Sequence, residues 1–330
     1  MFLNDIFHVL CKGKYQTELA AVRYCLHTMN KLTREFKLKQ TVKQIVKPAM
    51  LILLSVALAS CAFSPSDHAG GDAPRSAAIV PLKAQKPLLG LVLGAGGARG
   101  FAHVGVIKAL EAAGIEADVV VGTSSGALVA SFYAGGMRAR ALESMALQLE
   151  DNDIFDFTPF GPGRVEGARL QKFVNHNVNG RMIEALGKPF AAVATEQSSG
   201  RMAVFNRGNT GIAVRASASV PTYFWPVVIN GQSYVDGALA SRVPAFLARQ
   251  MGADVVVAVD ISRSPAQDAD AADVVIRPQT ARSRINDFQH RQANIAAGET
   301  AARAVVEQIR ARLAAVADSK AKGVIASIRP

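Results

Sequence analysis

The chain has 330 residues, enough for one large α/β domain beyond its first 60 residues, and 50% of its residues are hydrophobic. Its formal net charge of +11 is not gathered into a basic stripe interleaved with aromatic residues, so the charge does not suggest a nucleic-acid-binding protein. Two of the three cysteines, Cys11 and Cys25, lie in the first 60 residues, so Cys61 alone would remain in a processed chain, and neither an intrachain disulfide nor a cysteine-based zinc site is expected there.

Residues 1–60 are expected to be a leader segment rather than part of a folded domain. A basic and polar stretch from Lys31 to Lys47 precedes the apolar run Ala49–Ala59. A helix of this length extends about 16 Å, roughly half of a bilayer's hydrocarbon core, which is too short for a membrane span and typical of the apolar region of a signal peptide. Because the basic region is unusually long, Met29 offers an alternative start of translation.

The sequence Leu58-Ala59-Ser60-Cys61 closes the apolar run and fits the pattern that bacterial lipoprotein signal peptidase cuts, directly before the cysteine. Cleavage would leave Cys61 as the new N-terminus, carrying diacylglycerol and an amide-linked acyl chain. Two or more acyl chains anchor a protein stably, where one chain is marginal. The alternative interpretation is a short buried or anchoring helix that ends in cysteine.

The residue after the cysteine is Ala62 rather than aspartate, which favours the outer membrane by resemblance to the rules of lipoprotein sorting. We therefore expect a protein of the bacterial cell envelope, held by acylated Cys61 and facing the periplasm. Residues 61–87 are rich in Ala, Ser, Pro, Gly and Asp and are interpreted as a lipidated flexible tether.

Strands and helices are predicted to alternate from residue 88 onward. The predicted strands are continuously apolar, which indicates a buried, mainly parallel sheet flanked by helices and hence the α/β class. The predicted elements are the strand Leu88–Leu93, the helix Ala102–Ala113, the strand Asp118–Val121, the helix Ser125–Ala134, the strands Phe190–Ala194, Met202–Phe205 and Ala253–Asp260, a hairpin over Pro226–Val235, and one long helix over Arg291–Ala317.

The turn Gly122-Thr123-Ser124-Ser125-Gly126 lies between a predicted strand and a predicted helix. A serine hydroxyl needs exposure, a base and donors for the oxyanion before it can act as a nucleophile. A Gly-x-Ser-x-Gly turn between strand and helix supplies the exposure, and the helix N-terminus adds positive potential. The motif alone is only moderately specific, but this setting favours Ser124 as a nucleophile.

The glycine-rich loop Gly94–Gly100 is the predicted oxyanion hole, because glycines allow several backbone N–H groups to point toward one place. The rival interpretation is a dinucleotide-binding fingerprint. That pattern requires its third glycine at position 99, where this chain has Arg99. A nucleotide-dependent oxidoreductase is therefore disfavoured, and Arg99 would instead add positive charge beside the loop.

No local motif identifies the general base that would accept the proton of Ser124. None of the histidines downstream of the leader stands in an obvious triad arrangement with Ser124; they are His68, His103, His176 and His290. Asp236, in Val235-Asp236-Gly237-Ala238, ends the predicted hairpin, where an acidic residue can activate a serine directly. An aspartate before glycine is also a common turn residue, so the residues alone leave both interpretations open.

From about Leu88 to Ala317 the chain resembles the patatin-like phospholipases, especially the bacterial branch. The resemblance rests on four ordered blocks, which are Gly94–Gly100 with the following helix, Gly122–Gly126, Arg215–Pro221 and Asp236-Gly237-Ala238. It implies a three-layer α/β fold with a mainly parallel central sheet over residues 88–317, followed by a tail at 318–330. No metal or organic cofactor is implied.

The resemblance also implies the roles of individual residues. Ser124 would be the nucleophile and Asp236 the base of a Ser–Asp dyad that uses no histidine. The backbone N–H groups of Gly96, Gly97 and Ala98 would form the oxyanion hole, with Arg99 beside them. Ala95 departs from the family, which often has glycine there, so the start of this loop would be shaped differently.

Residues Asp151–Val165 break the alternation of strands and helices. This segment holds Ile154, Phe155, Phe157 and Phe160 among prolines and glycines. Its aromatic side chains would either lie over an acyl-binding cleft or pack into the core of the domain.

The expected function is that of a lipid-anchored serine acyl-ester hydrolase of the phospholipase A or lysophospholipase type, acting on a lipid or lysolipid. The family also covers neutral lipase and transacylase activities, and the motifs do not choose among these. The competing interpretation is a non-catalytic envelope lipoprotein that binds lipids or proteins through the same fold.

Overall fold

The computed structural model describes residues 27, 65–159 and 161–328. Cys61 and the apolar run before it lie outside the described residues, as does Phe160. The chain divides into two compact units, Met1–Phe63 and Ser64–Pro330, and the second unit contains every element described below. In the described part of the chain, no helix combines the length and the apolar character needed to cross a bilayer.

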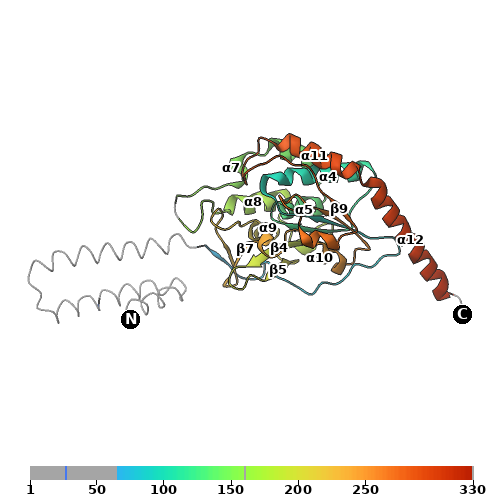
Figure 1. The fold of residues 1–330 in the computed structure, drawn as a ribbon. Coiled ribbons are helices and arrows are strands. Elements are labelled where there is room, and N and C mark those ends of the chain that lie inside the picture. Colours follow the sequence, from blue (N-terminus) through green and yellow to red (C-terminus); the bar gives the residue numbers. More distant parts are fainter. Residues whose placement is uncertain (1–26, 28–64, 160, 329–330) are drawn as a thin grey trace, which may run out of the picture. The chain divides into compact units, whose positions relative to one another are not determined.

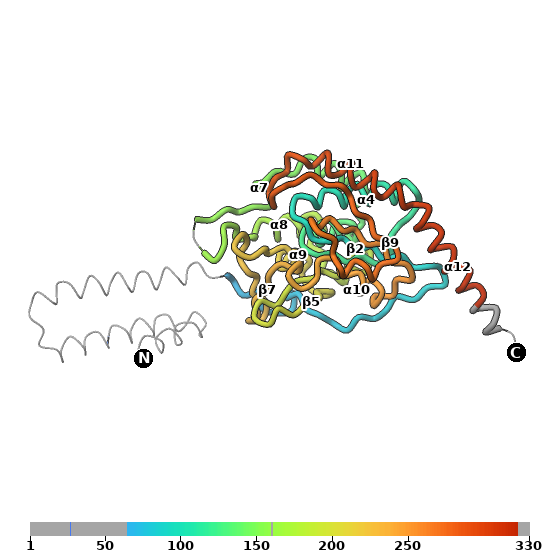
Figure 2. The backbone as a smooth tube through the Cα atoms, viewed as in Figure 1, coloured from blue at the N-terminus to red at the C-terminus, as the bar shows by residue number. Residues whose placement is uncertain are grey.

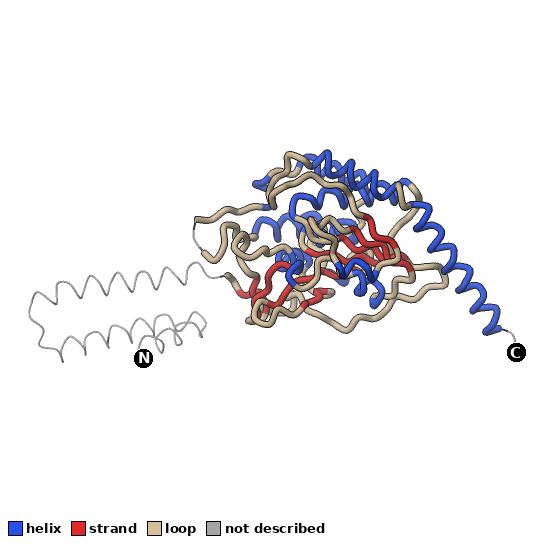
Figure 3. Tube along the Cα trace, in the orientation of Figure 1, coloured by secondary structure: helices blue, strands red, loops and turns tan. Residues whose placement is uncertain are grey.

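A nine-stranded sheet forms the centre of the described part of the second unit (Figure 3). Its order is β1-β6-β7-β4-β3-β2-β8-β9, with β5 paired to β4 off this path. The pairs β4-β3, β3-β2, β2-β8 and β8-β9 are parallel, whereas β5 and β7 run antiparallel to β4. The strands are β1 Asp67–His68, β2 Leu89–Leu93, β3 Val119–Thr123, β4 Phe190–Glu196, β5 Met202–Phe205, β6 Val227–Ile229, β7 Gln232–Asp236, β8 Val255–Val259 and β9 Val274–Ile276. The predicted α/β fold with a mainly parallel sheet is confirmed.

Helices cover both faces of this sheet (Figure 1). In β2, Leu91 and Leu93 belong to one hydrophobic cluster, whereas Val92 belongs to another. The first cluster includes residues of α4, α5, α8 and α9, and the second includes residues of α10, so alternate side chains of one strand enter opposite layers. The helices are α4 Phe101–Ala112, α5 Ser125–Ala134, α6 Ala139–Gln148, α7 Asp151–Ile154, α8 Ala168–Asn177, α9 Thr210–Ser217, α10 Ala245–Gln250, α11 Arg291–Arg303 and α12 Val306–Ile328.

Helix α11 packs closely on α4, the helix that follows the glycine-rich loop (Figure 1). A Cβ atom on Gly105 of α4 would lie 1.9 Å from the carbonyl oxygen of Ile295, and one on Gly298 of α11 would lie 2.0 Å from that of Ala102. The two backbones therefore approach more closely than any larger residue would permit at either position. Asn294 of α11 also donates from Nδ2 to the carbonyl of Ala98 at 3.5 Å.

The C-terminal helix differs from its prediction. The sequence predicts one helix over Arg291–Ala317, but α11 ends at Arg303 and α12 begins at Val306. No glycine or proline lies near this break. The break accompanies burial of Val306 and Ile309 against the core, so tertiary packing overrides a locally uninterrupted helical pattern. Helix α12 also continues through the predicted tail, where Lys320 forms an ion pair with Asp254 at 2.6 Å.

The described part of the predicted tether is attached to the domain, so the interpretation as a flexible tether is wrong for it (Figure 2). Strand β1 pairs in parallel with β6 at the end of the sheet. Farther along, the N–H of Arg75 donates to the carbonyl of Arg207 at 3.1 Å, and that of Leu82 donates to the carbonyl of Met251 at 2.8 Å. Backbone hydrogen bonds of this kind need no apolar side chains, so the composition of the segment did not predict them.

Candidate active site

Ser124 lies on a tight turn between β3 and α5. Strand β3 ends at Thr123, and Ser124 is the N-cap of α5 with φ 57° and ψ −125°. A positive φ is uncommon for a residue with a side chain and costs about 1–3 kcal/mol when the conformation is strained. The turn is also closely packed, because a Cβ atom on Gly126 would lie 2.0 Å from the carbonyl oxygen of Leu93. Glycine at this position allows the turn to fit against the end of β2.

The Ser124 hydroxyl donates a hydrogen bond to Oδ2 of Asp236 at 2.6 Å, although the two residues are 112 positions apart. Strand β4 brings them together because it lies between β3 and β7. On one side of β4, Val193 pairs with Thr123, and on the other side Ala194 pairs with Asp236. Both side chains are almost fully buried, with exposed fractions of 6% and 3%.

Burial raises the pKa of the Asp236 carboxyl to about 6, because a carboxylate loses solvation when it is removed from water. Hydrogen bonds from the Ser124 hydroxyl and the Ala238 N–H oppose this rise, since both favour the charged form. A carboxylate whose pKa lies near 6 is ionised at neutral pH and is a stronger base than an ordinary aspartate. Its chemistry therefore suits the removal of a proton from the hydroxyl that it faces.

The structure keeps the histidines away from this pair. His103 is fully buried, and its Nε2 donates to the carbonyl of Gly94 at 2.8 Å. Burial lowers the pKa of His103 to about 4, so its ring is neutral at physiological pH. His68 lies beside Arg215, with Nε2 and Nη1 3.4 Å apart, while His176 and His290 are exposed. Among the residues that the structure describes, no histidine is hydrogen-bonded to Ser124.

The glycine-rich loop reaches the same cavity as Ser124. Gly97 and Ala98 line this cavity together with the serine, whereas Gly96 and Arg99 are not among the lining residues. Arg99 is turned back toward the loop, because its Nε donates to the carbonyl of Gly96 at 3.1 Å. Of the four residues predicted for the oxyanion hole, the structure therefore brings Gly97 and Ala98 to the cavity wall but not Gly96 and Arg99.

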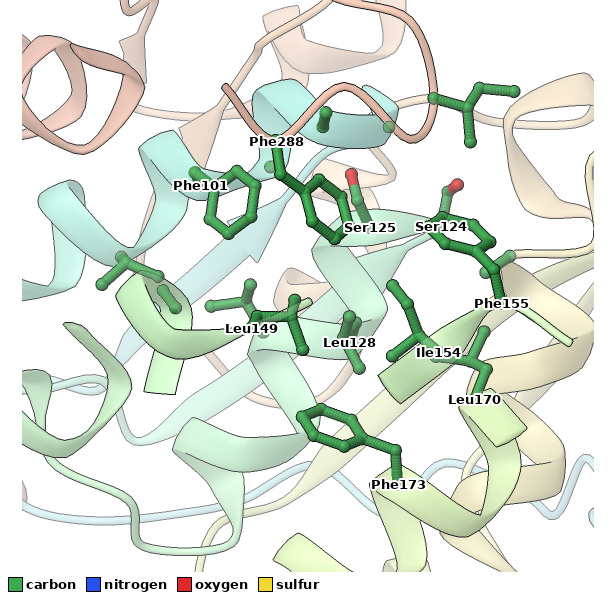
Figure 4. Close-up of a pocket in the computed structure, with 18 of the residues that line it drawn as sticks. Phe101, Ser124, Ser125, Leu128, Leu149, Ile154, Phe155, Leu170, Phe173 and Phe288 are labelled. Atoms are coloured by element: carbon green, nitrogen blue, oxygen red, sulfur yellow. The ribbon is translucent and has the colours of Figure 1, made fainter. Parts of the chain in front are cut away.

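The cavity next to Ser124 is lined almost entirely by apolar side chains (Figure 4). In this view Phe155 and Phe288 lie on the side of Ser124, while Phe173 lies on the opposite side. The lining residues are Gly97, Ala98, Gly100, Phe101, Val104, Ser124, Ser125, Leu128, Val129, Phe132, Leu142, Met145, Ala146, Leu149, Ile154, Phe155, Leu170, Phe173, Ala218, Val220, Phe224, Ile285 and Phe288. An apolar cavity that has Ser124 at its wall, hydrogen-bonded to Asp236, suits a ligand that is mostly hydrocarbon and has one reactive polar group.

The two interpretations of the aromatic segment 151–165 both describe part of it. Ile154 and Phe155 are buried, and they also line the cavity. Phe157 is 55% exposed and does neither. From the other apolar segment, Tyr223–Trp225, Phe224 contributes to the cavity wall. Burial in the core and contact with the cavity are therefore not exclusive here.

Two serines near the end of α9 contact the pair directly, and the sequence did not assign them a role. The Ser217 hydroxyl accepts the backbone N–H of Ser124 at 2.9 Å, and the carbonyl of Ser219 accepts the backbone N–H of Asp236 at 2.8 Å. Both lie in the block Arg215–Pro221, whose sequence alone does not reveal these two contacts. Within the described residues, no cluster of three or more histidine, cysteine or carboxylate side chains is placed to hold a metal ion.

Comparison with known proteins agrees with this fold. Residues 91–249 match the family model of the patatin-like phospholipases. The chain is 35% identical over 190 residues to patatin-like phospholipase domain-containing protein 6 of Mus musculus, which covers 54% of this chain and 14% of that protein. It is 32% identical over 203 residues to an uncharacterized NTE family protein of Mycobacterium bovis, covering 60% of this chain and 56% of the relative. The chain thus spans only part of the length of these relatives.

A similar fold occurs in the crystal structure of VipD from Legionella pneumophila. The two structures agree with a TM-score of 0.50 over 68% of this chain and 67% of that one, at 14% sequence identity. At this identity the likeness concerns the fold alone.

Proposed function

We propose that this protein hydrolyses acyl esters of lipids with Ser124 as nucleophile and Asp236 as general base, since residues 91–249 match the family model of the patatin-like phospholipases. The observation that carries the proposal is the 2.6 Å hydrogen bond from the Ser124 hydroxyl to Asp236 Oδ2, at the wall of an apolar cavity. A serine hydroxyl that faces a buried carboxylate has the base that nucleophilic attack requires.

In the first step, Ser124 Oγ attacks the acyl carbonyl carbon while its proton passes to Asp236 Oδ2. Negative charge then develops on the former carbonyl oxygen. Backbone N–H groups of the loop Gly96, Gly97 and Ala98 would stabilise this oxyanion, helped by the N-terminus of α5, which starts directly after Ser124. Collapse of the tetrahedral intermediate breaks the ester C–O bond, and Asp236 returns the proton to the departing alkoxide.

In the second step, water replaces the alcohol. Asp236 takes a proton from this water as it attacks the acyl-enzyme, and a second oxyanion forms in the same place. Its collapse releases the fatty acid and returns the proton to Ser124 Oγ. A base whose pKa is about 6 can both accept and return a proton near neutral pH, as this sequence of steps requires.

The lining of the cavity supports a long-chain acyl group as the bound part of the substrate. Helices α4, α5, α6 and α8 supply apolar side chains to it, and Ser124 lies at the wall where the ester carbon would have to be placed. Each buried methylene contributes about 0.8 kcal/mol, so an acyl chain gains binding energy along its length. The substrate class is therefore a lipid or lysolipid.

We further propose that the protein is anchored in the bacterial cell envelope by acylated Cys61, in the outer membrane and facing the periplasm. The support is the sequence Leu58-Ala59-Ser60-Cys61 after a short apolar run. An anchored enzyme would be held close to its lipid substrate.

A fluorophosphonate probe tests the proposed chemistry, because only an activated serine reacts with it. The full chain in detergent micelles should become labelled, should release fatty acid from phospholipid or lysophospholipid, and should lose both properties in Ser124→Ala. Ser131→Ala is a matched control, since Ser131 is a buried serine of α5 whose hydroxyl bonds only to the carbonyl of Leu128. A folded wild-type protein that neither labels nor hydrolyses lipid, yet binds it, would instead support the non-catalytic lipid-binding interpretation.

A further inference from the structure

Ser217 is the last residue of α9 and has no exposed surface. Its hydroxyl forms two hydrogen bonds. Oγ donates to the carbonyl of Val193 in β4 at 2.5 Å, and it accepts the backbone N–H of Ser124 at 2.9 Å. One hydroxyl thus connects the central sheet to the backbone of the proposed nucleophile.

We infer that Ser217 is a positioning residue, whose hydroxyl fixes the orientation of Ser124 toward Asp236 by holding the peptide group before Ser124. This inference rests on the proposed Ser–Asp chemistry. Ser217 itself touches neither the reacting hydroxyl nor, in the proposed mechanism, the substrate.

The backbone of Ser124 explains why such a bond is needed. Its φ of 57° and ψ of −125° lie in a region that persists only when surrounding contacts determine it. The N–H of Ser124 cannot take part in the hydrogen bonds of α5, because Ser124 precedes the first residue of that helix. The bond to Ser217 therefore satisfies this buried donor and opposes rotation of the peptide group, which would turn the serine side chain away from Asp236.

The same short stretch also holds Asp236. The N–H of Asp236 donates to the carbonyl of Ser219, two residues after Ser217, and the hydroxyl of Ser219 donates to the carbonyl of Arg215 at 2.8 Å. Thr195 of β4 secures the other side of the residue, because its hydroxyl donates to the carbonyl of Asp236 at 2.8 Å. The end of α9 thus holds both members of the pair by their backbones and helps to set the distance between their side chains.

The test compares Ser217→Ala with Ser131→Ala in the full chain. Both variants remove a fully buried helical hydroxyl that donates to a backbone carbonyl, but only Ser217 also accepts the N–H of Ser124. Misplacing a reacting group by about 1 Å can cost on the order of 100-fold in rate. We therefore expect Ser217→Ala to lower kcat by about 10- to 100-fold with KM within about twofold of wild type, while Ser131→Ala keeps kcat within about twofold.

The pH dependence of kcat/KM distinguishes a positioning role from a loss of stability, because a loss of stability alone would not shift it. The hydrogen bond from Ser124 lowers the pKa of Asp236, so a serine that turns away should let this pKa rise. The acidic limb of kcat/KM should therefore move to higher pH in Ser217→Ala and stay in place in Ser131→Ala. Ser217→Cys retains a weak acceptor on a side chain of the same shape but with a larger atom, so kcat should lie between that of Ser217→Ala and that of wild type. This variant also serves as the test if Ser217→Ala does not fold.

Equal kcat values for Ser217→Ala and Ser131→Ala, or an effect of Ser217→Ala on KM alone, would overturn the positioning role. If Ser217→Ala does not fold, the test is Ser217→Cys. A Ser217→Cys protein with the wild-type kcat and the wild-type acidic limb of kcat/KM would also overturn the positioning role. Failure of the proposed function gives a different result, because wild-type protein would then fail to react with the fluorophosphonate probe.

Discussion

The rings of Phe155 and Phe157 stack with their centroids 5.8 Å apart and an angle of 29° between their planes. Phe155 is 3% exposed and lines the apolar cavity, whereas Phe157 is 55% exposed. The outer ring therefore covers the inner one without belonging to the core. A long acyl chain or a lipid surface that approached Phe155 from this side would meet Phe157 first.

The pair provides a test of substrate access. We expect Phe157→Ser to reduce hydrolysis of long-chain lipids while hydrolysis of a short soluble ester changes little. The free energy of unfolding should fall by less than about 1 kcal/mol, because the side chain is largely exposed. Phe155→Ala, the buried control, should cost about 3–5 kcal/mol and reduce both activities. Thermal unfolding and activity assays on both substrates measure these effects. If Phe157→Ser lowered both activities equally and caused a large drop in Tm, this would contradict the role of Phe157 in substrate access.

Ser124→Ala and Asp236→Asn should each abolish ester hydrolysis and leave the fold intact, as judged by circular dichroism. The double variant should lose little more than either single one, because the two side chains act as one unit. His103→Gln is the contrast. We expect His103→Gln to lower kcat far less than Ser124→Ala does. A glutamine amide can still donate toward the carbonyl of Gly94, which is the only role that the structure gives the His103 ring. A loss of kcat in folded His103→Gln equal to that of Ser124→Ala would restore histidine as the base.

Asp236 should make the protein less stable as pH rises. Its pKa is about 6 in the folded chain and about 4 when unfolded, so between these values the folded state binds more protons and unfolding becomes easier as pH increases. Above pH 6 the full effect is present. Asp236→Asn removes this buried charge and should raise the free energy of unfolding by about 1–3 kcal/mol at pH 8, with almost no gain near pH 4. Denaturant titrations at the two pH values measure the difference, and a gain that does not depend on pH would rule out this origin.

The same carboxyl governs activity in the opposite direction. Because Asp236 must be ionised to accept the proton of Ser124, kcat/KM should rise with pH through about pH 6 and then level off. A limb near pH 4 would show that burial does not perturb this carboxyl in solution.

The proposed lipid anchor predicts a defined N-terminus. Expressed in a bacterium, mature protein should begin at acylated Cys61 and sediment with membranes, and Cys61→Ala should accumulate as uncleaved precursor. Intact-mass spectrometry of the purified protein checks both. An unmodified N-terminus at another residue would remove the lipoprotein assignment while leaving the enzymatic proposal unaffected.

The elements that could be predicted from sequence are those that residues close together in the chain determine. The turn around Ser124 has its glycines within two residues, and the continuously apolar strands show a sheet covered on both faces. The position of Asp236 next to Ser124 depends on the order β3-β4-β7, which no local pattern encodes, and its role came only from family resemblance. Ser217 could not be found either, because a serine at a helix end usually satisfies its own backbone. The break between α11 and α12 likewise depends on packing rather than on a helix-breaking residue.

The contact between α4 and α11 also has a consequence for the order of synthesis. The Asn294–Ala98 contact joins residues 196 positions apart, so a ribosome must complete most of the domain before α11 can cover the helix that follows the glycine-rich loop. Until then, the face of α4 that carries Gly105 has no partner, and the loop lacks the support of Asn294. A growing chain therefore cannot complete this site early, and the proposed hydrolysis of lipids would begin only after translation has passed α11.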